Sequence, residues 1–187
     1  MEFNEEKYKS FVEPQILRCR DGDWEHAKRV VRWVKELGER RNNLSLLIAA
    51  GYIHDIGWRD VLPPGRITLE KLMQYEPEAN KNSRPFAREL LKEFGFLEDD
   101  INTVLRLIDA ADAHGAELDD EKVIVDADTL SKLSIDHVRE KFQESKWKGM
   151  YEYFAKETPK RIQTEKGKKI YPKLLKELAV VLQIENE

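Results

Sequence analysis

The sequence predicts an all-α fold, a helical bundle, and three observations lead to this prediction. Apolar residues recur at helical spacing among many charged ones, as in amphipathic helices that keep one wet face. Glycine and proline punctuate the chain sparsely, and the segments between them keep this spacing. No segment reads convincingly as a strand, since Val123-Ile124-Val125 is short and lies in a helical pattern. We expect the 187 residues to form a single domain, with a core at about 20–135 and a helical extension at about 136–187.

The first two predicted helices follow each other closely. Asp23 is a suitable N-cap for a helix at about 24–39, and the apolar face of that helix consists of Ala27, Val30, Val31, Val34 and Leu37. Asn42 or Asn43 could cap the next helix, at about 44–55, which is apolar nearly all the way round. A helix of that kind belongs in the middle of a bundle.

Beyond the second helix, Gly57 and the Pro63-Pro64-Gly65 sequence predict a loop at 58–66. Thr68 can cap a short helix that ends at Tyr75. The remaining predicted helices span about residues 83–95, 99–112, 119–133, 135–155 and 164–184.

Composition and charge exclude several classes of protein. The formal net charge of -4 provides no basic field for nucleic acid, so a phosphorylated ligand would need a local cation. Cys19 is the only cysteine, which excludes an intramolecular disulfide. The acidic N-terminus lacks the pattern of a signal peptide, and the longest apolar stretch, at 44–56, is too short to span a bilayer. We therefore expect a soluble, cytoplasmic protein with no nucleic-acid or membrane partner.

The most informative residues are His54 and Asp55, at the end of the most apolar helix. An imidazole and a carboxylate are costly to place there unless both are satisfied. Helix neighbours point about 100° apart, so these two side chains contact each other poorly but can converge on one ion. Taken alone, the pair is explained more simply as a hydrogen-bonded core histidine and a helix-terminal aspartate.

Two other helices strengthen the case for a metal site. His26 shares its helix face with Val30 and Leu37, which places it inward. Asp126 and Asp128 lie in an otherwise apolar helix, and periodicity does not say which of them faces a site. Three helices thus direct imidazole or carboxylate groups into a bundle interior, which is a common way to build a metal site.

This ordered series, with Ile56-Gly57 after the His-Asp pair and the Asp126-Ala127-Asp128-Thr129-Leu130 segment, resembles the HD-domain superfamily of metal-dependent phosphohydrolases. The residues around His26 and the segment 82–96 are also similar to that family, over about residues 20–135 in all. The resemblance implies an all-α bundle with one divalent ion bound by His26, His54, Asp55 and Asp128. It selects Asp128 because the family carries its last ligand in an Ala-Asp-x-Leu unit, which leaves Asp126 as a supporting or capping group.

Departures from the family pattern narrow the expected activity. Asn82 stands where members with two metals carry a histidine, and His114 is the only histidine between Asp55 and Asp128. We therefore expect one metal, which argues against cyclic-dinucleotide phosphodiesterase and di-iron oxygenase activity. Trp58 replaces the acidic residue of members that hydrolyse nucleoside monophosphates, and the Glu-Asp pair of the alarmone hydrolases is missing.

The predicted ligands suit Mn, Fe, Co, Ni or Zn better than Ca, and leave positions open for water and a phosphate oxygen. Such an ion would activate water and neutralise phosphoryl charge. Candidate phosphate contacts are Arg59 and Arg66 in the loop, with Lys81 and Arg18 behind them. The catalytic candidates are Asp55, Arg59 and Asp60, with Asp60 as a general acid or base. Each of the four cations can also be an ordinary solvated surface residue, and Asp60 can be a loop-capping residue.

The leading prediction is hydrolysis of a phosphate ester or anhydride, with a small nucleotide or phosphorylated metabolite as substrate. One alternative is a catalytically inactive metal- or ligand-binding regulatory module of the same fold. Another is a helical interaction protein whose histidines and aspartates are structural. Two smaller expectations concern the extension: His137 is exposed, and Trp147, Tyr151 and Phe154 fit a core or a homodimer contact.

Overall fold

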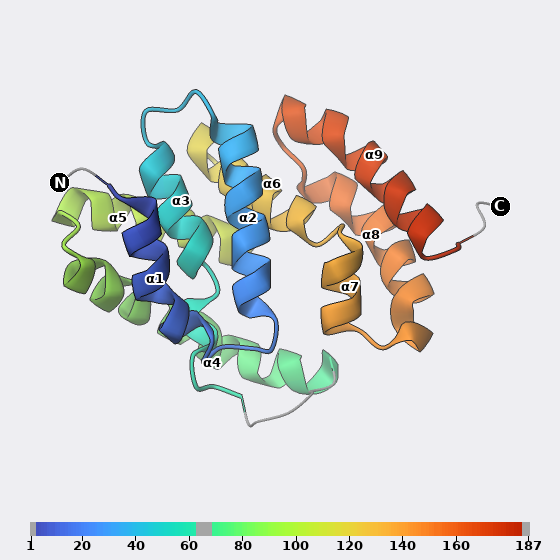
Figure 1. The fold of residues 1–187 in the computed structure, drawn as a ribbon, viewed down its shortest axis with the longest axis horizontal. Helices are drawn as coiled ribbons and strands as arrows, with labels where there is room; N and C mark the ends of the chain where they lie inside the picture. The colour runs from blue at the N-terminus through green and yellow to red at the C-terminus, as the bar shows by residue number, and fades with distance from the viewer. Residues whose placement is uncertain (1–2, 63–68, 185–187) are drawn as a thin grey trace.

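All regular structure in the described residues, 3–62 and 69–184 of this computed structural model, is helical (Figure 1). The α-helices are α1 (Glu5–Ile16), α2 (Asp23–Gly38), α3 (Leu44–Ile53), α4 (Leu69–Phe94), α5 (Glu98–Ala113), α6 (Asp119–Ser131), α7 (Ile135–Lys141), α8 (Trp147–Arg161) and α9 (Glu165–Val181). Two short 3-10 helices are η1 (Ile56–Trp58) and η2 (Glu144–Lys146). The all-α prediction is confirmed.

Helix α1 has no counterpart among the predicted elements, although its sequence carries the signals. The side chain of Asn4 accepts a hydrogen bond from the backbone of the first turn, as an N-cap does. Tyr8, Val12 and Ile16, four residues apart, are fully or almost fully buried. This spacing places one stripe of α1 against the core.

The prediction of two separate helices at 68–75 and 83–95 is wrong, because α4 spans both segments. It is one helix that continues through Pro77 and Pro85. The reason is close packing on η1, since a Cβ atom on Gly57 would lie 2.1 Å from the carbonyl oxygen of Ala79 and 3.0 Å from the amide nitrogen of Ser83. Packing of this face offsets the backbone hydrogen bonds that the two prolines remove. The predicted cap Thr68 and the Pro63-Pro64-Gly65 sequence lie outside the described residues.

The single helix predicted at 135–155 is also wrong, because the chain breaks between α7 and α8. Phe142 has an extended backbone, with φ of -128° and ψ of 146°, and its carbonyl accepts a hydrogen bond from Trp147 Nε1 at 3.3 Å. Both rings pack against the apolar cluster that contains Leu130 and Phe154. Partial burial of two large rings on either side of the turn explains the break.

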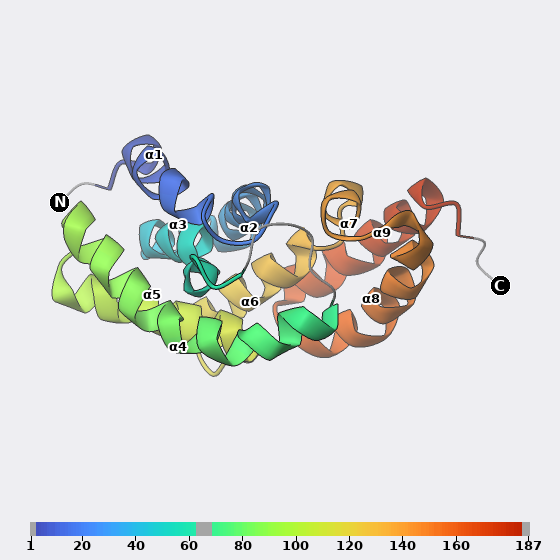
Figure 2. The same ribbon diagram turned by 90° about the horizontal axis from the view of Figure 1, so that it is seen from below.

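Helix α6 connects the two apolar clusters of the molecule. The larger cluster joins α1 to α5 with the N-terminal half of α6, and the smaller joins the end of α6 with α7, α8 and α9. In both views, α8 and α9 lie on the opposite side of α6 from α1 and α5 (Figures 1 and 2). None of the helices in the described part of the chain is long and apolar enough to cross a membrane.

Candidate metal centre

His26 and His54 meet because α2 and α3 pack closely. His26 lies on the buried face of α2 with Val30, and His54 directly follows the last residue of α3. Gly51 permits the close approach, since a Cβ atom there would lie 3.1 Å from a methyl group of Val31. The side chains of both histidines are almost completely buried. Their Nε2 atoms lie 3.2 Å apart.

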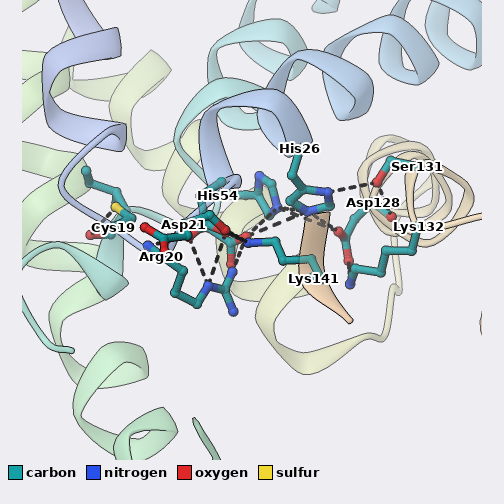
Figure 3. A network of polar contacts seen from close by, with 12 residues as sticks. Cys19, Arg20, Asp21, His26, His54, Asp128, Ser131, Lys132 and Lys141 are labelled. Atoms are coloured by element: carbon teal, nitrogen blue, oxygen red, sulfur yellow. Dashed lines mark hydrogen bonds and ion pairs between the residues drawn. The ribbon is translucent and has the colours of Figure 1, made fainter. Parts of the chain in front are cut away.

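Helix α6 adds a carboxylate to this pair. Asp128 Oδ1 lies 3.1 Å from His26 Nε2 and 3.6 Å from His54 Nε2 (Figure 3). Asp55 comes from the turn after α3, and its Oδ2 lies 3.6 Å and 3.3 Å from the same two nitrogens. Four side chains from three parts of the chain therefore direct two nitrogens and two oxygens toward a common point.

Hydrogen bonds fix which nitrogen of each imidazole faces this point. His54 Nδ1 lies 3.0 Å from the carbonyl oxygen of Gly51, which can only accept, so Nδ1 carries a proton. Ser131 Oγ donates to the carbonyl of Asp128 at 2.7 Å, and therefore accepts from His26 Nδ1 at 3.1 Å. Both Nε2 atoms are thus available as ligands, the arrangement in which outer partners orient metal-binding histidines.

The electrostatics of the cluster favour a positive charge at its centre. Burial lowers the pKa of His26. Burial also opposes protonation of His54, but the carboxylates of Asp55 and Asp128 raise its pKa well above the usual value. Both carboxylates are themselves held ionised despite burial, since Arg20 lowers the pKa of Asp55 and Lys132 lowers the pKa of Asp128.

The residues fit a metal ion on two observations. The donor atoms of His26, His54 and Asp128 all lie within 4.8 Å of one another, so these three could hold an ion. Asp128 Oδ1 is buried without a hydrogen-bond partner among the described residues, and a bound cation would satisfy it. Imidazole and carboxylate donors together suit a first-row transition ion. Asp55 is 18% exposed and also binds Arg20, so its part as a fourth ligand is a proposal.

Comparison with known proteins agrees with this geometry. A family model of the HD domain matches residues 23–133 of the 187-residue chain. The chain belongs to the HD domain family. Such domains are generally metal-dependent hydrolases, and the match spans all four predicted ligands. Searches of curated proteins and of solved structures found no significant match.

Asp126 faces away from the centre of this HD domain. It is completely buried, and its carboxylate accepts hydrogen bonds from the amides of Gln163 and Thr164, both at 2.8 Å, and from Thr164 Oγ1 at 2.5 Å. Thr164 is the N-cap of α9, so Asp126 joins α6 to the start of that helix. This matches the capping role expected from the resemblance.

The structure does not bring Arg18 or Asp60 to the ligand cluster. These two side chains, each more than half exposed, pair with each other, with Arg18 Nε donating to Asp60 Oδ1 at 3.1 Å. Lys81 is exposed on α4. Arg66 lies outside the described residues.

Arg59 is occupied elsewhere as well. It donates to Gln15 Oε1 at 3.1 Å, lies 3.5 Å from Glu89, and stacks 4.0 Å from the ring centroid of Phe86. These contacts hold it between α1 and α4. Phosphate binding by Arg59, Arg18 or Lys81 remains a prediction that the geometry does not favour, and phosphate binding by Arg66 stays a prediction.

Two cations that sequence reasoning did not select contact the cluster directly. Lys132 Nζ lies 2.6 Å from Asp128 Oδ2, and Arg20 lies 2.5 Å from Asp55 Oδ2. Lys132 follows Asp128 by four residues on or next to the same helix, a spacing that predicts an ion pair. Arg20 has no such signal, because its position depends on how the chain enters α2.

Three further titratable side chains lie around the ligand cluster: those of His137, Asp112 and His114. His137 was expected to be exposed, but is only 6% exposed and packs its ring 5.4 Å from that of His26, because α7 folds over the site. Burial and the charge of Asp55 raise the pKa of Asp112 to about 7. His114 ends α5 with a left-handed backbone, and it is not among the side chains whose donor atoms converge.

Proposed function

We propose that this HD-domain protein is a metal-dependent phosphohydrolase that acts on a phosphate ester or anhydride of a small nucleotide or phosphorylated metabolite. The observation that carries the proposal is the convergence of His26, His54 and Asp128, with the buried Asp128 Oδ1 left without a hydrogen-bond partner in the described part of the chain. A centre of this kind within an HD domain supports hydrolysis more than a structural role.

We assign His26, His54, Asp55 and Asp128 as the side chains that would hold one divalent transition ion. When bound, such an ion supplies Lewis acidity and an activated water. The chain's own residues prepare the site for it. Ser131 and the carbonyl of Gly51 hold the imidazoles with Nε2 inward, so little reorganisation is needed on binding.

One alternative function is a protein that binds the metal but does not catalyse hydrolysis. Trp58 stands where nucleotide-hydrolysing relatives carry an acidic residue, and Arg20 stacks 4.5 Å from the centroid of its ring. A regulatory module that binds metal or ligand without turnover fits this feature. A cytoplasmic location and a homodimer are also part of the proposal, with no bearing on the choice between the two functions.

A screen tests the proposal. Wild-type protein loaded with Mn, Co or Ni is incubated with phosphorylated metabolites, and released phosphate is measured. We expect metal-dependent release in wild type and none in Asp55→Ala, with the helix content of that variant nearly intact by circular dichroism. Asp119→Ala is the matched control, since Asp119 is exposed on α6 and pairs with Lys122 at 2.9 Å, away from the ligand cluster.

The outcomes separate the candidate functions. Bound metal without turnover of any substrate supports the regulatory module. Protein that binds no metal supports a non-enzymatic helical interaction protein. Loss of helix content in Asp55→Ala would indicate that this carboxylate is structural rather than catalytic.

A further inference from the structure

Three ion pairs surround the ligand cluster and balance its charge. The pairs are Asp55 with Arg20 at 2.5 Å, Asp128 with Lys132 at 2.6 Å, and Asp23 with Lys141 at 2.8 Å. Arg20 also lies 2.9 Å from Asp23, which links the first and third pairs. Three carboxylates therefore meet three cations next to the two imidazoles.

Two of the three carboxylates lie inside, whereas the cations, together with Asp55 at 18% side-chain exposure, lie at the edge. The side chains of Asp23 and Asp128 are 0% and 4% exposed, whereas those of Arg20, Lys132 and Lys141 are 20%, 27% and 18% exposed. Figure 3 shows the charged ends of these three cations on the same side of His26 and His54. We call Arg20, Lys132 and Lys141 the cation rim.

A divalent ion at the cluster would upset this balance. It would add two positive charges to a site whose carboxylates and cations already cancel, and it would compete with Arg20 and Lys132 for the oxygens of Asp55 and Asp128. Arg20 and Lys132 would then present uncompensated donors beside the ion, whereas Lys141 would keep its contacts with Asp23 and with the carbonyl oxygen of Asp21. A phosphate group with two negative charges restores neutrality, and its oxygens suit both guanidinium and ammonium groups.

We propose that the cation rim is the subsite for the substrate's phosphate group, and that it becomes available only when the metal is bound. This inference rests on the proposed function. It replaces Arg59 and Arg18 as the phosphate contacts, since those side chains bind Gln15 and Asp60 instead. The ring of Trp58 beneath Arg20 fixes the guanidinium plane, which prepares it for an anion.

The proposed phosphate subsite leads to a prediction that differs from the one expected if these ion pairs were only structural. Lys132 competes with the metal for Asp128, so Lys132→Met should bind metal as tightly as wild type or more tightly. The same variant should bind phosphate more weakly, because one donor is gone. Loss of a merely structural ion pair would weaken both.

The experiment is a calorimetric titration of the 187-residue protein, first with Mn²⁺ alone and then with inorganic phosphate in the presence and absence of Mn²⁺. The variants are Lys132→Met and Lys141→Met, with Lys122→Met as control, since Lys122 lies on α6 and pairs with the exposed Asp119. We expect phosphate to bind wild type only with Mn²⁺ present. Lys132→Met should weaken phosphate binding about tenfold or more, as loss of a charge-assisted hydrogen bond does. Lys141→Met should weaken it less, because Lys141 stays paired with Asp23, and the control should not weaken it.

The other outcomes contradict the rim in distinguishable ways. Unchanged phosphate affinity in Lys132→Met and Lys141→Met overturns it, as does a parallel loss of metal and phosphate binding in Lys132→Met. Metal binding by wild type without phosphate binding overturns the rim and leaves the proposed metal site intact. Failure of wild type to bind Mn²⁺, or any other transition ion, removes the proposed function and the rim together.

Discussion

Asp126 and Asp128 lie two residues apart on α6 and are almost equally buried, at 0% and 3% exposure, but their carboxylates have different surroundings. Two residues are about 200° apart around a helix, so these side chains point to opposite faces. Asp126 accepts three hydrogen bonds from the chain segment that begins α9. Asp128 meets two imidazoles and Lys132, and its Oδ1 has no hydrogen-bond partner in the described structure.

This difference shows what distinguishes a ligand from a structural carboxylate. Burial alone does not, because both residues are buried. Hydrogen-bond satisfaction does, since Asp126 has its partners within the fold, while Asp128 Oδ1 has no hydrogen-bond partner among the described residues and faces the unprotonated Nε2 atoms of two imidazoles. The same helix therefore fastens the α8–α9 segment on one face and contributes to the metal centre on the other.

The largest expected effect is that of Asp128→Ala on metal binding. Loss of a partner that only orients a ligand costs about 10- to 100-fold in affinity, so loss of the ligand itself should cost more than about 100-fold. Activity should fall with it. Metal titration of the purified variant measures the effect, and circular dichroism checks that the helices remain. Wild-type affinity in this variant would mean that Asp128 was assigned wrongly.

Asp126→Ala should show the opposite pattern. Two backbone amides and the Thr164 hydroxyl lose their acceptor, so the free energy of unfolding should fall by about 2–4 kcal/mol. Metal stoichiometry should stay at the wild-type value, because the carboxylate faces away from the histidines. Urea denaturation and elemental analysis of the same sample measure both quantities. Loss of metal from folded Asp126→Ala would erase the distinction between the two faces.

Ser131→Ala tests how far orientation of His26 matters. Its hydroxyl accepts from His26 Nδ1, so removal should lower metal affinity by about 10- to 100-fold while the protein stays folded. Thr129→Ser is the matched control, since the Thr129 hydroxyl donates to the carbonyl of Val125 on its own helix. Equal metal affinities for the two variants would show that Ser131 does not position the ligand.

The smallest expected effect concerns Asp112 and pH. Burial and the charge of Asp55 raise its pKa from 3.8 to about 7, Asp109 adds to the rise, and Ser83 and His54 oppose it. A raised carboxyl pKa stabilises the folded protein fully below about pH 4, and this contribution is lost as pH rises to about 7.

Asp112→Asn does not titrate, so its stability relative to wild type should increase between pH 4 and pH 7. The gain should be on the order of 1–2 kcal/mol, since each pKa unit is worth about 1.4 kcal/mol before solvent screening. Urea denaturation of metal-free protein across this pH range measures it. A difference independent of pH would mean that Asp112 is ionised throughout.

The sequence alone predicts the helices that position the site. The apolar stripe of α2 and the nearly continuous apolar run of α3 depend on local residues, and both are found in the structure. Periodicity left Asp126 and Asp128 as alternatives, because each lies on a face that is buried against a different part of the molecule.

Features that depend on distant contacts could not be predicted in this way. The continuity of α4 depends on how closely Gly57 lets Ala79 approach, and the burial of His137 depends on where α7 folds. Arg20 reaches Asp55 across 35 positions of sequence, a separation at which no local pattern acts. The phosphate contacts were therefore assigned to loop cations near the His-Asp pair, and the three rim cations were missed.

The most direct test of the account is elemental analysis of protein purified without chelator, alongside the His54→Ala variant. The account predicts about one transition-metal ion per chain in wild type and none in His54→Ala, because His54 Nε2 faces the centre of the cluster. Absence of metal from both proteins, even after reconstitution with Mn, Fe, Co, Ni and Zn, would contradict it and mean that His26 and His54 are core histidines.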